Sequence, residues 1–213
     1  MTTLQTIGLL GGTFDPIHRG HIDIANEAAS ACQFERIIII PNNQAPTAKQ
    51  VQATPAQRLE MVKLATQHHH SLHASDVEIQ RTGKSYTIDT LREFRALYPD
   101  ASISFLLGED AFHTLNQWSH HDEFLTLCHL IVINRNTHNK LLPTEIEQII
   151  SSHQCYDSDE LHTKTHGCIL HLPIEEIDVS STSIRQELHD NRHSDYLDEQ
   201  VQQYILKNNL YLP

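Results

Sequence analysis

The sequence has few of the residues that mark special protein classes. Of its 213 residues only four are cysteines, and they form no CxxC pair, so we expect reduced thiols in a cytosolic protein. No apolar run approaches the roughly 20 residues that span a bilayer. The first residues also lack the charged-then-apolar pattern of a secretion signal. These absences predict a cytoplasmic protein with no membrane association.

Basic residues are also scarce. Lysine and arginine total 15 against 27 aspartates and glutamates, a formal net charge of −12. This charge argues against general binding of nucleic acid, so an anionic ligand must be held by a local basic cluster. Histidine is abundant, with 17 residues. The histidine run 68–70 lies at a helix end, where successive side chains point in different directions, so we do not expect it to chelate a metal ion.

Strand-like and helical patterns alternate along the chain. The strand-like runs are 5–10, 36–41, 103–108, 129–135 and 168–172, with a weaker one at 76–81, and the helical patterns are 20–32, 55–69, 86–98, 110–117, 144–152, 181–190 and 197–207. The four isoleucines at 37–40 are apolar on both faces, as in a parallel strand that is covered on both sides. The polar stretch 156–167 is predicted to be a surface loop.

These patterns predict an α/β fold with a doubly wound, Rossmann-like, mostly parallel sheet and helices on both faces. The length and the ordinary composition, with 39% apolar and 20% charged residues, predict a single domain over 1–213. Its C-terminal helical part, about 181–213, is expected to pack on the sheet domain. In such folds ligands bind beyond the carboxyl ends of the strands.

The stretch from Gly11 to His21, GGTFDPIHRGH, joins a strand-like run to a helical one. Helix N-termini offer unpaired N–H groups and a positive dipole end, so anions bind there. The glycines let a phosphate approach the backbone, and His18 adds a donor that can be cationic or neutral near pH 7. The pattern predicts a phosphate cradle, with Asp15-Pro16 serving the turn. Two rival phosphate motifs, GxxxxGK(S/T) and GxGxxG after the first strand, are absent.

A second polar segment, VSSTSIR at 179–185, opens the helical pattern 181–190. Hydroxyl groups at a helix start cap the helix and can also face an anion. Arg185 lies one turn into this helix, so its guanidinium can reach back toward phosphate oxygens. Taken alone, the segment is more typical of an ordinary serine-rich helix cap, and only the histidine motif favours the phosphate interpretation.

Two further segments offer groups that could bind a ligand. SYTIDTL at 85–91 is a hydroxyl-rich helix start that can bind a carboxylate through free N–H groups. Gly108 ends an apolar strand where a base or ribose can approach. The single tryptophan, Trp118, has polar neighbours, and an exposed indole is a platform for stacking a pyridinium ring.

The HxGH pattern after a strand resembles the nucleotidyltransferase superfamily, and the longer GGTFDPIHRGH is similar to the nicotinate-nucleotide adenylyltransferase family. The SYTxDTL-like segment, an ISSTxxR-like segment with valine first, and Trp118 occur in the family's order. The segment 41–49 resembles the family's NNxPPH-plus-basic pattern, but Thr47 stands where the family has histidine, so the role of that histidine is in doubt.

The resemblance implies a role for each matching position. The implied catalytic residues are His18, His21 and Arg185; the implied ATP-binding residues are Gly11, Gly12, Thr13, Phe14, Gly108, Asp110, Ser180 and Thr182; and the implied nicotinate mononucleotide-binding residues are Asn42, Lys49, Ser85, Tyr86, Thr87, Trp118 and Arg135. The implied reaction joins nicotinate mononucleotide to the AMP part of ATP in NAD biosynthesis, without a covalent intermediate. Mg²⁺ is expected to be held through substrate phosphates, with no protein metal site.

Several alternatives stay open. The chain could be another adenylyl- or cytidylyltransferase, acting on phosphopantetheine or nicotinamide mononucleotide, or a non-catalytic nucleotide sensor that keeps the fold. An aminoacyl-tRNA synthetase would need a KMSKS-like loop and a tRNA-binding extension, which the sequence lacks. The expected partners are the two small-molecule substrates, and a homo-oligomer is possible, since the sequence does not fix the oligomeric state.

Overall fold

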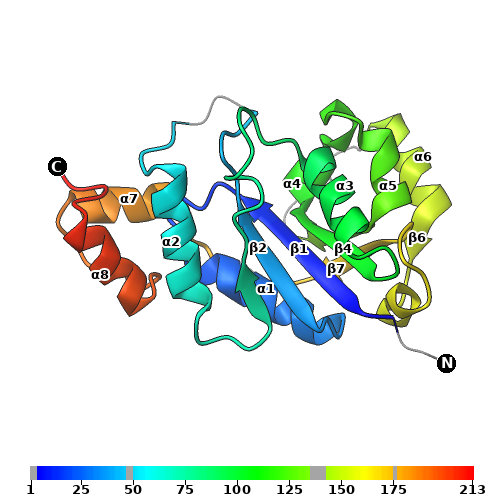
Figure 1. Cartoon of the computed structure of the whole chain (residues 1–213), viewed down its shortest axis with the longest axis horizontal. Helices are drawn as coiled ribbons and strands as arrows, with labels where there is room; N and C mark the ends of the chain where they lie inside the picture. Colours follow the sequence, from blue (N-terminus) through cyan, green and yellow to red (C-terminus); the bar gives the residue numbers. More distant parts are fainter. Residues whose placement is uncertain (1–3, 47–49, 135–142, 175–176) are drawn as a thin grey trace.

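A seven-stranded parallel sheet forms the centre of the molecule (Figure 1). The structure is a computed structural model that describes residues 4–46, 50–134, 143–174 and 177–213. The strands are β1 (Thr6–Gly12), β2 (Arg36–Pro41), β3 (Leu72–Ala74), β4 (Ser102–Gly108), β5 (His129–Asn134), β6 (Gln154–Cys155) and β7 (Ile169–Pro173). Their order across the sheet is β3-β2-β1-β4-β5-β7-β6.

Helices connect successive strands and cover both faces of this sheet. They are α1 (Arg19–Ala31), α2 (Pro55–Thr66), α3 (Thr87–Leu97), α4 (Glu109–Phe112), α5 (Phe124–Leu127), α6 (Thr144–His153), α7 (Ser181–His189) and α8 (Glu199–Lys207), with short 3₁₀ turns at Leu115–Gln117, His121–Glu123 and Ser158–His162. The predicted fold class, a Rossmann-like sheet between helices, is confirmed. None of the helices that the structure describes is long and apolar enough to cross a membrane.

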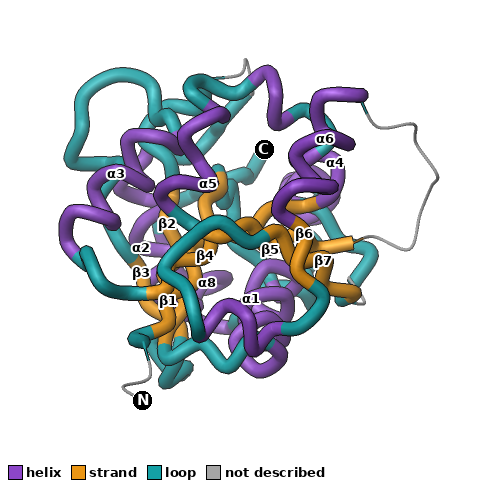
Figure 2. Tube along the Cα trace, turned by 90° about the vertical axis from the view of Figure 1, so that its right-hand side faces the viewer, coloured by secondary structure: helices purple, strands orange, loops and turns teal. Residues whose placement is uncertain are grey.

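The four isoleucines of β2 divide between two hydrophobic cores. Ile37 and Ile39 join the core that includes α1 and α2, whereas Ile38 and Ile40 join the core that includes α3 and α5. Successive side chains of a strand point to opposite faces of the sheet, so a strand with apolar residues at every position needs cover on both sides. Figure 2 shows the strands running between α1 on one side and α3, α5 and α6 on the other.

The order of winding places the ends of β1 and β4 at a switch point. From β1 the chain moves outward through β2 to β3, and it then returns to add β4 on the other side of β1. The connections after β1 and β4 therefore leave the sheet in opposite directions, and the crevice between them is the usual ligand site of a doubly wound fold. The segment from Gly11 to His21 follows β1, and Gly108 ends β4.

Several predicted elements differ from the observed ones. Residues 76–81 form turns, not a strand, and the edge strand β3 lies just before them. The predicted helix 110–117 divides into α4 and the 3₁₀ turn Leu115–Gln117. Strand β6 has only two residues, too few to produce an alternating pattern. The short strands β3 and β6 were missed because two or three residues carry no periodicity of their own.

The prediction for two of the cysteines was wrong, whereas 156–167 is largely exposed and irregular, as a surface loop should be. Cys155 and Cys168 form a disulfide, although reduced thiols were expected, while Cys32 and Cys128 are free and buried. The intervening segment contains a 3₁₀ turn and is tied to the sheet, because Ser102 Oγ donates to Leu161 O at 2.6 Å. Backbone carbonyls of a polar segment can be bound by the core at positions that its side-chain pattern does not reveal.

The C-terminal helices share a core with the sheet. Ile184 of α7 and Val201 and Ile205 of α8 belong to the same hydrophobic cluster as Ile39 of β2. Figure 1 shows α7 and α8 beside α2, at the opposite end of the molecule from α6. The residues at about 181–213 therefore pack on the sheet domain through apolar contacts, which contribute roughly 25 cal/mol for each Å² of apolar surface buried.

Arg95 of α3 gathers backbone carbonyls at the amino ends of the strands. Its guanidinium donates to the carbonyl oxygens of Leu127, Tyr98, Pro99, Ala101 and Thr165, at distances of 2.7–3.1 Å. We expect Arg95→Met to lower the free energy of unfolding by about 3 kcal/mol, because hydrogen bonds to a charged donor are lost together and carbonyls are left without partners. Urea denaturation monitored by circular dichroism measures this change.

Arg92 is the matched control, because it lies on the same helix but is exposed and pairs with the side chains of Asp89 and Glu123. Exposed ion pairs contribute little to stability, so Arg92→Met should leave the free energy of unfolding nearly unchanged. Equal effects of the two substitutions would contradict the anchoring role of Arg95.

Candidate active site

Two histidines meet at the start of α1, directly after the loop that follows β1. His18 is the N-cap residue of the helix, and its backbone N–H donates to Nδ1 of His21 at 3.3 Å. The two imidazole rings lie close together, with centroids 3.7 Å apart and planes tilted by 33°. His18 Nδ1 is buried and has no hydrogen-bond partner among the described residues. A buried polar atom without a partner is costly, so this nitrogen is suited to a polar ligand at the helix N-terminus.

Burial determines the charge of this histidine pair. His18 is only 7% exposed, and burial lowers its pKa from 6.5 to about 4. Burial, followed by repulsion from His18, lowers the pKa of His21 well below its usual value. Both rings are therefore neutral at pH 7 in the ligand-free protein, since desolvation disfavours the charged imidazolium. A neutral imidazole still offers one N–H donor to an anion.

The loop between β1 and α1 is shaped around Phe14. A Cβ atom on Gly12 would lie 2.7 Å from the Phe14 ring, so only glycine fits at this position. Phe14 has a left-handed backbone with φ of 50°, and its ring packs edge-on against His21 with centroids 5.0 Å apart. Gly11 is exposed at the end of β1. The close packing of Phe14 on Gly12 keeps the loop near the helix start.

The start of α7 contacts this same loop. Arg185 Nη1 donates to the backbone oxygen of Asp15 at 2.7 Å, and Nη2 donates to Thr182 Oγ1 at 3.2 Å. Ser181 Oγ donates to the carbonyl oxygen of Pro16 at 2.9 Å. A Cβ atom on Gly20 would come within 3.0 Å of Val179, so α1 and the segment before α7 are in tight contact. The two predicted phosphate motifs, 165 residues apart in places, thus meet at one loop.

Ser180 caps α7 through its own side chain. Its Oγ accepts a hydrogen bond from Ser183 N at 3.0 Å, as expected of a serine at an N-cap position. Ser180 and Thr182 are both exposed. Their hydroxyl groups lie at the N-terminus of a nine-residue helix, beside the loop that carries His18.

Asp15 and Tyr211, which the sequence analysis did not assign to the site, anchor the loop between β1 and α1. The carboxylate of Asp15 is 3% exposed and accepts hydrogen bonds from the backbone N–H groups of Gln52 and Ala53 and from the hydroxyl of Tyr211. Asp15 was assigned only to the turn, and Tyr211 was not considered. Tyr211 lies after the last helical pattern, so no periodicity signals its contact.

Arg58 of α2 is a third missed residue. It is 1% exposed, and its guanidinium donates to the backbone oxygens of Thr13, Asn42 and Asn43 and to Asn42 Oδ1. Burial lowers its pKa, and the Asp15 carboxylate opposes that shift. Arg58 stands at helical spacing with the buried Met61, Val62 and Ala65. A charged residue on the apolar stripe of an amphipathic pattern was the available signal, since buried arginines are nearly always paired.

The predicted mononucleotide-binding segments after β2 and before α3 also meet. Asn43 N donates to Ser85 Oγ at 2.9 Å, and Ser85 N donates to Gln44 O at 2.9 Å. The Asn42 side chain donates to Thr13 Oγ1 at 3.1 Å, which links this region to the loop after β1. Tyr86 is exposed at the N-cap position of α3, and Thr87 is half-buried in the first turn. These predicted residues therefore lie along a continuous set of contacts.

Gly108 and Trp118 lie at the end of β4 and beyond it. A Cβ atom on Gly108 would meet nothing within 4 Å, so open space adjoins this backbone. Trp118 is half-buried, and its ring packs edge-on against Phe105 and Phe124 with centroids 6.4 and 6.1 Å apart. These two T-shaped contacts hold the tryptophan ring against the core. Asp110 is exposed in α4.

The remaining sequence predictions have mixed outcomes. Lys49, Arg135 and the unusual Thr47 lie outside the described residues. The histidine run 68–70 follows α2, where His68 and His69 contact the side-chain amides of Gln200 and Asn26. The roles of the other predicted site residues stay predictions.

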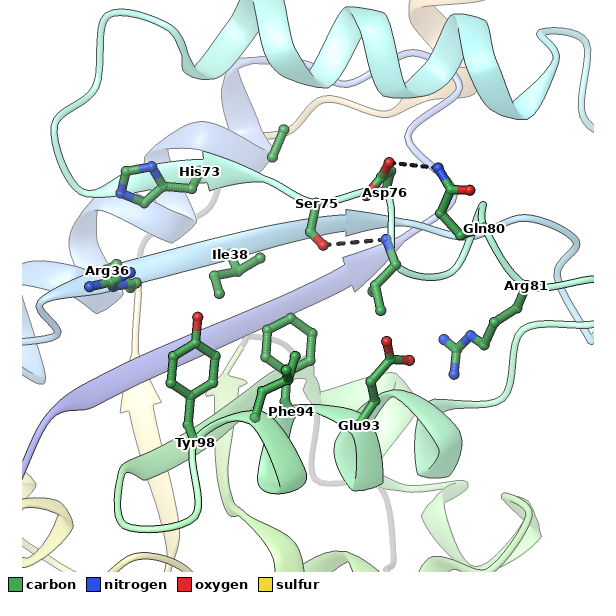
Figure 3. A pocket seen from close by; sticks show the side chains of 13 residues that line it. Arg36, Ile38, His73, Ser75, Asp76, Gln80, Arg81, Glu93, Phe94 and Tyr98 are labelled. Atoms are coloured by element: carbon green, nitrogen blue, oxygen red, sulfur yellow. Dashed lines mark hydrogen bonds between the residues drawn. The ribbon is translucent and has the colours of Figure 1, made fainter.

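Two cavities differ in their relation to this cluster. One of about 580 Å³ is lined by residues of the Asn43 segment, by Thr54 and Pro55 at the start of α2, and by Arg58 and Lys84, so it adjoins the predicted mononucleotide-binding segments. Figure 3 shows another, of about 440 Å³, between α3 and the strands β2 and β3. None of the predicted site residues lines that second cavity, whose wall includes Arg36, Asp76 and Glu93.

Comparisons with known proteins agree with this arrangement. Residues 9–187 match the model of the family described as cytidylyltransferase-like. Among curated proteins, a probable nicotinate-nucleotide adenylyltransferase of Psychromonas ingrahamii is 36% identical over 97% of each chain, and one of Acidithiobacillus ferrooxidans is 34% identical over 99% of this chain and 97% of the relative.

Among solved structures, the nicotinic acid mononucleotide adenylyltransferase of Plasmodium falciparum complexed with NaAD has a TM-score of 0.72 at 19% identity, and 96% of each chain is covered. The structure of that protein complexed with APC gives a TM-score of 0.70 with 97% of each chain covered. At such low identity the structural likeness concerns the fold.

The depressed pKa of His18 makes stability depend on pH. In the unfolded chain this histidine takes up a proton near pH 6.5, whereas in the folded protein it does so only near pH 4. Its contribution to stability is therefore present above pH 6.5 and is lost as the pH falls toward 4. We expect the stability loss between pH 7 and pH 5 to be about 2 kcal/mol smaller in His18→Asn, by urea denaturation.

His70, which is exposed, provides a control for the substitution itself, and His70→Asn should keep the pH dependence of the unsubstituted protein. If His18→Asn keeps it as well, burial of His18 does not hold its pKa down.

Proposed function

Because the chain belongs to the nicotinate-nucleotide adenylyltransferase family, within the cytidylyltransferase-like group, we propose that it joins nicotinate mononucleotide to the AMP part of ATP. The products are nicotinate adenine dinucleotide and pyrophosphate, a step of NAD biosynthesis. The matched relatives are covered over nearly their full length. We treat 1–213 as one nucleotidyltransferase domain, in which 181–213 completes the site.

One observation carries this proposal: Arg185 donates to the loop that leads into the histidine pair. We assign His18, His21 and Arg185 to the charge that develops on the transferring phosphoryl group. A helix N-terminus, two N–H donors from imidazole and a guanidinium fork are donors that act on phosphate oxygens. The helix start provides backbone N–H groups, and the side chains of His18 and Arg185 are largely buried, so the positions of these donors are preorganised.

The proposed ATP-binding residues surround this centre. They are Gly11, Gly12, Thr13 and Phe14 of the first loop, Gly108 and Asp110 at the end of β4, and Ser180 and Thr182 at the start of α7. Open space beside Gly108 supports the approach of a ribose or base there. The exposed hydroxyl groups of Ser180 and Thr182 and the first N–H groups of α7 support contact with the triphosphate.

The proposed nicotinate mononucleotide-binding residues are Asn42, Lys49, Ser85, Tyr86, Thr87, Trp118 and Arg135. The hydrogen bonds between the Asn43 and Ser85 segments support a single binding region for Asn42, Ser85, Tyr86 and Thr87. The start of α3 at Thr87 offers N–H groups to the nicotinate carboxylate. The fixed indole of Trp118 offers a face for stacking the pyridinium ring.

The chemistry follows from the nature of the acceptor. A phosphate oxygen of the mononucleotide attacks the α-phosphorus of ATP in line, and pyrophosphate leaves with the electrons of the broken P–O bond. This oxygen is already anionic near pH 7, so no side-chain nucleophile is needed, and catalysis consists of positioning and charge stabilisation. Because His18 and His21 are neutral when no ligand is bound, an arriving triphosphate favours their protonation.

A divalent cation accompanies nucleoside triphosphates in this class of enzyme, and we propose Mg²⁺. The carboxylate of Asp15 is occupied by two backbone N–H groups and a hydroxyl, so it does not offer a vacant ligand in the loop. This donor set fits a metal ion that is held through substrate phosphates, because Mg²⁺ keeps water and phosphate ligands readily. The ion would reduce the mutual repulsion of the two anionic substrates.

The proposed partners are accordingly ATP and nicotinate mononucleotide, with no nucleic acid and no membrane. The net charge of −12 supports the absence of a general polyanion-binding surface. We propose a cytoplasmic location, where the substrates of NAD biosynthesis occur, and the possible homo-oligomer is left to measurement of the mass in solution.

A pyrophosphate-release assay with ATP and Mg²⁺ tests the function. Nicotinate mononucleotide, nicotinamide mononucleotide and phosphopantetheine are compared as acceptors, and turnover should be greatest with the first. We expect His18→Ala to lower kcat by about two orders of magnitude, because one transition-state donor contributes on the order of 3 kcal/mol. His70→Ala is the exposed control and should keep full activity.

Turnover confined to phosphopantetheine would reassign the chain to another transferase of the same superfamily. ATP binding without turnover on any acceptor would indicate a nucleotide sensor. Undiminished kcat in His18→Ala would remove this histidine from the mechanism.

Trp118 provides a test of the mononucleotide subsite. We expect Trp118→Leu to raise KM for nicotinate mononucleotide at least tenfold and to change KM for ATP less than twofold, since only the pyridinium ring loses a stacking face. Steady-state kinetics with each substrate varied in turn separate the two constants. Leucine keeps an apolar contact with Phe105 and Phe124, so the fold is retained, and an equal rise in both constants would refute the stacking role.

A further inference from the structure

The Asp15 carboxylate is bound on every side by donors from distant segments. Oδ1 accepts hydrogen bonds from Ala53 N at 3.0 Å and from the Tyr211 hydroxyl at 2.6 Å, and Oδ2 accepts one from Gln52 N at 2.9 Å. The two backbone donors precede α2. The Tyr211 hydroxyl is thus the one side-chain donor among the described residues, and it lies 196 positions away in the sequence.

Arg185 contacts the same residue without closing on its carboxylate. Its Nη1 donates to the backbone oxygen of Asp15 at 2.7 Å but lies 3.9 Å from Oδ2. An arginine beside a buried carboxylate ordinarily forms a two-pronged, charge-assisted pair. Here the donors from Gln52, Ala53 and Tyr211 already occupy the carboxylate. The guanidinium therefore keeps N–H groups for an anion instead of spending them on Asp15.

Tyr211 is itself held firmly in place. Its side chain is 6% exposed and packs in the core that contains Ile184 of α7 and Val201 of α8. Its backbone has φ of 60°, the left-handed region that is unfavourable for a residue with a Cβ atom. A residue that keeps such a conformation is fixed by its surroundings. Burial, and then the hydrogen bond to Asp15, raise the pKa of Tyr211 far above its usual value, so the phenol remains a donor.

From these contacts we propose that Tyr211 is a positioning residue, which donates the second hydrogen bond to Asp15 Oδ1 and so keeps the Arg185 guanidinium directed at the triphosphate. This inference rests on the proposed function, because it takes the triphosphate as the ligand of Arg185. Without the hydroxyl, Oδ1 loses a donor. The Arg185 guanidinium, whose Nη1 lies 3.9 Å from Oδ2, then moves onto the carboxylate. The cost of the change appears at the ATP subsite and not at the mononucleotide subsite.

The substitution Tyr211→Phe removes only the hydroxyl and keeps the ring in the core. We expect kcat/KM for ATP to fall about tenfold, the scale of one hydrogen bond to a charged group, while KM for nicotinate mononucleotide changes less than twofold. Tyr204→Phe is the matched control, since Tyr204 lies on α8 and its hydroxyl has no hydrogen bond to the Asp15 cluster. This control should keep both constants within twofold.

A second measurement does not depend on activity. Arg185 has a side chain that is 19% exposed, so phenylglyoxal can modify it, and peptide mass spectrometry gives the rate. In Tyr211→Phe the rate should fall at least threefold, because the guanidinium closes on Asp15, whereas Tyr204→Phe should leave it unchanged. An unchanged modification rate at Arg185 in Tyr211→Phe overturns the proposal. A lower melting temperature of this variant with unchanged kcat/KM for ATP overturns it as well.

The double variant Arg185→Ala/Tyr211→Phe separates this inference from the proposed function. If Tyr211 acts through Arg185, the tyrosine substitution should change kcat/KM for ATP less than twofold in the Arg185→Ala background. A full tenfold effect in that background overturns the positioning role. Full activity of Arg185→Ala by itself, or no adenylyl transfer by the unsubstituted protein, refutes the site assigned above, while the modification rates still decide how Tyr211 holds Arg185.

Discussion

The hydrogen bond from Arg185 to the carbonyl oxygen of Asp15 is the contact on which the candidate site depends. It joins the start of α7 to the loop after β1, and thereby joins two polar segments that are remote in sequence. Neither segment is specific by itself, because a helix cap rich in serine and a turn rich in glycine are common in proteins. Their juxtaposition at the carboxyl end of β1 gives one place where an arginine, a helix N-terminus and two imidazole rings can act on the same anion.

Burial of the two histidines also limits the positive charge of the candidate site. Neutral imidazole rings cost less to bury than charged ones, so the ligand-free protein keeps His18 and His21 uncharged. The positive charge near the loop then comes from Arg185 and, beneath it, from Arg58, whose donors are spent on backbone oxygens. The chain as a whole is acidic. Attraction of a polyanion is therefore local, and it strengthens when the anion itself draws protons onto the histidines.

Much of the fold could be predicted because its signals are periodic. The isoleucines of β2, the amphipathic helices and the alternation of strands and helices each follow from side-chain direction. The short elements β3 and β6 and the Cys155–Cys168 bond could not be predicted, because two- and three-residue strands and a cysteine pairing depend on the surrounding sheet. The main motifs of the site were visible in the sequence for a different reason, since each stands where a helix begins.

What the sequence concealed are the residues that hold the motifs in place, Asp15, Arg58 and Tyr211. Their partners are mainly backbone atoms of distant segments, and a backbone atom leaves no mark on the composition or the spacing of a sequence. Only the charged residue on the apolar stripe of α2 gave a local hint. Candidate site residues were therefore easier to select from the sequence than the residues that support them.

Arg95 gathers its carbonyl partners just before β4, β5 and β7, whereas Arg185 and His18 lie beyond the opposite ends of the strands. The length of the sheet thus separates the carbonyl contacts of Arg95 from the proposed ligand-binding region. Substitutions at the two ends of the strands are expected to differ in effect. Those near Arg95 lower stability, and those near Arg185 and His18 leave a folded protein with lower activity. The residues at one end of the strands can therefore change in evolution without a compensating change at the other end.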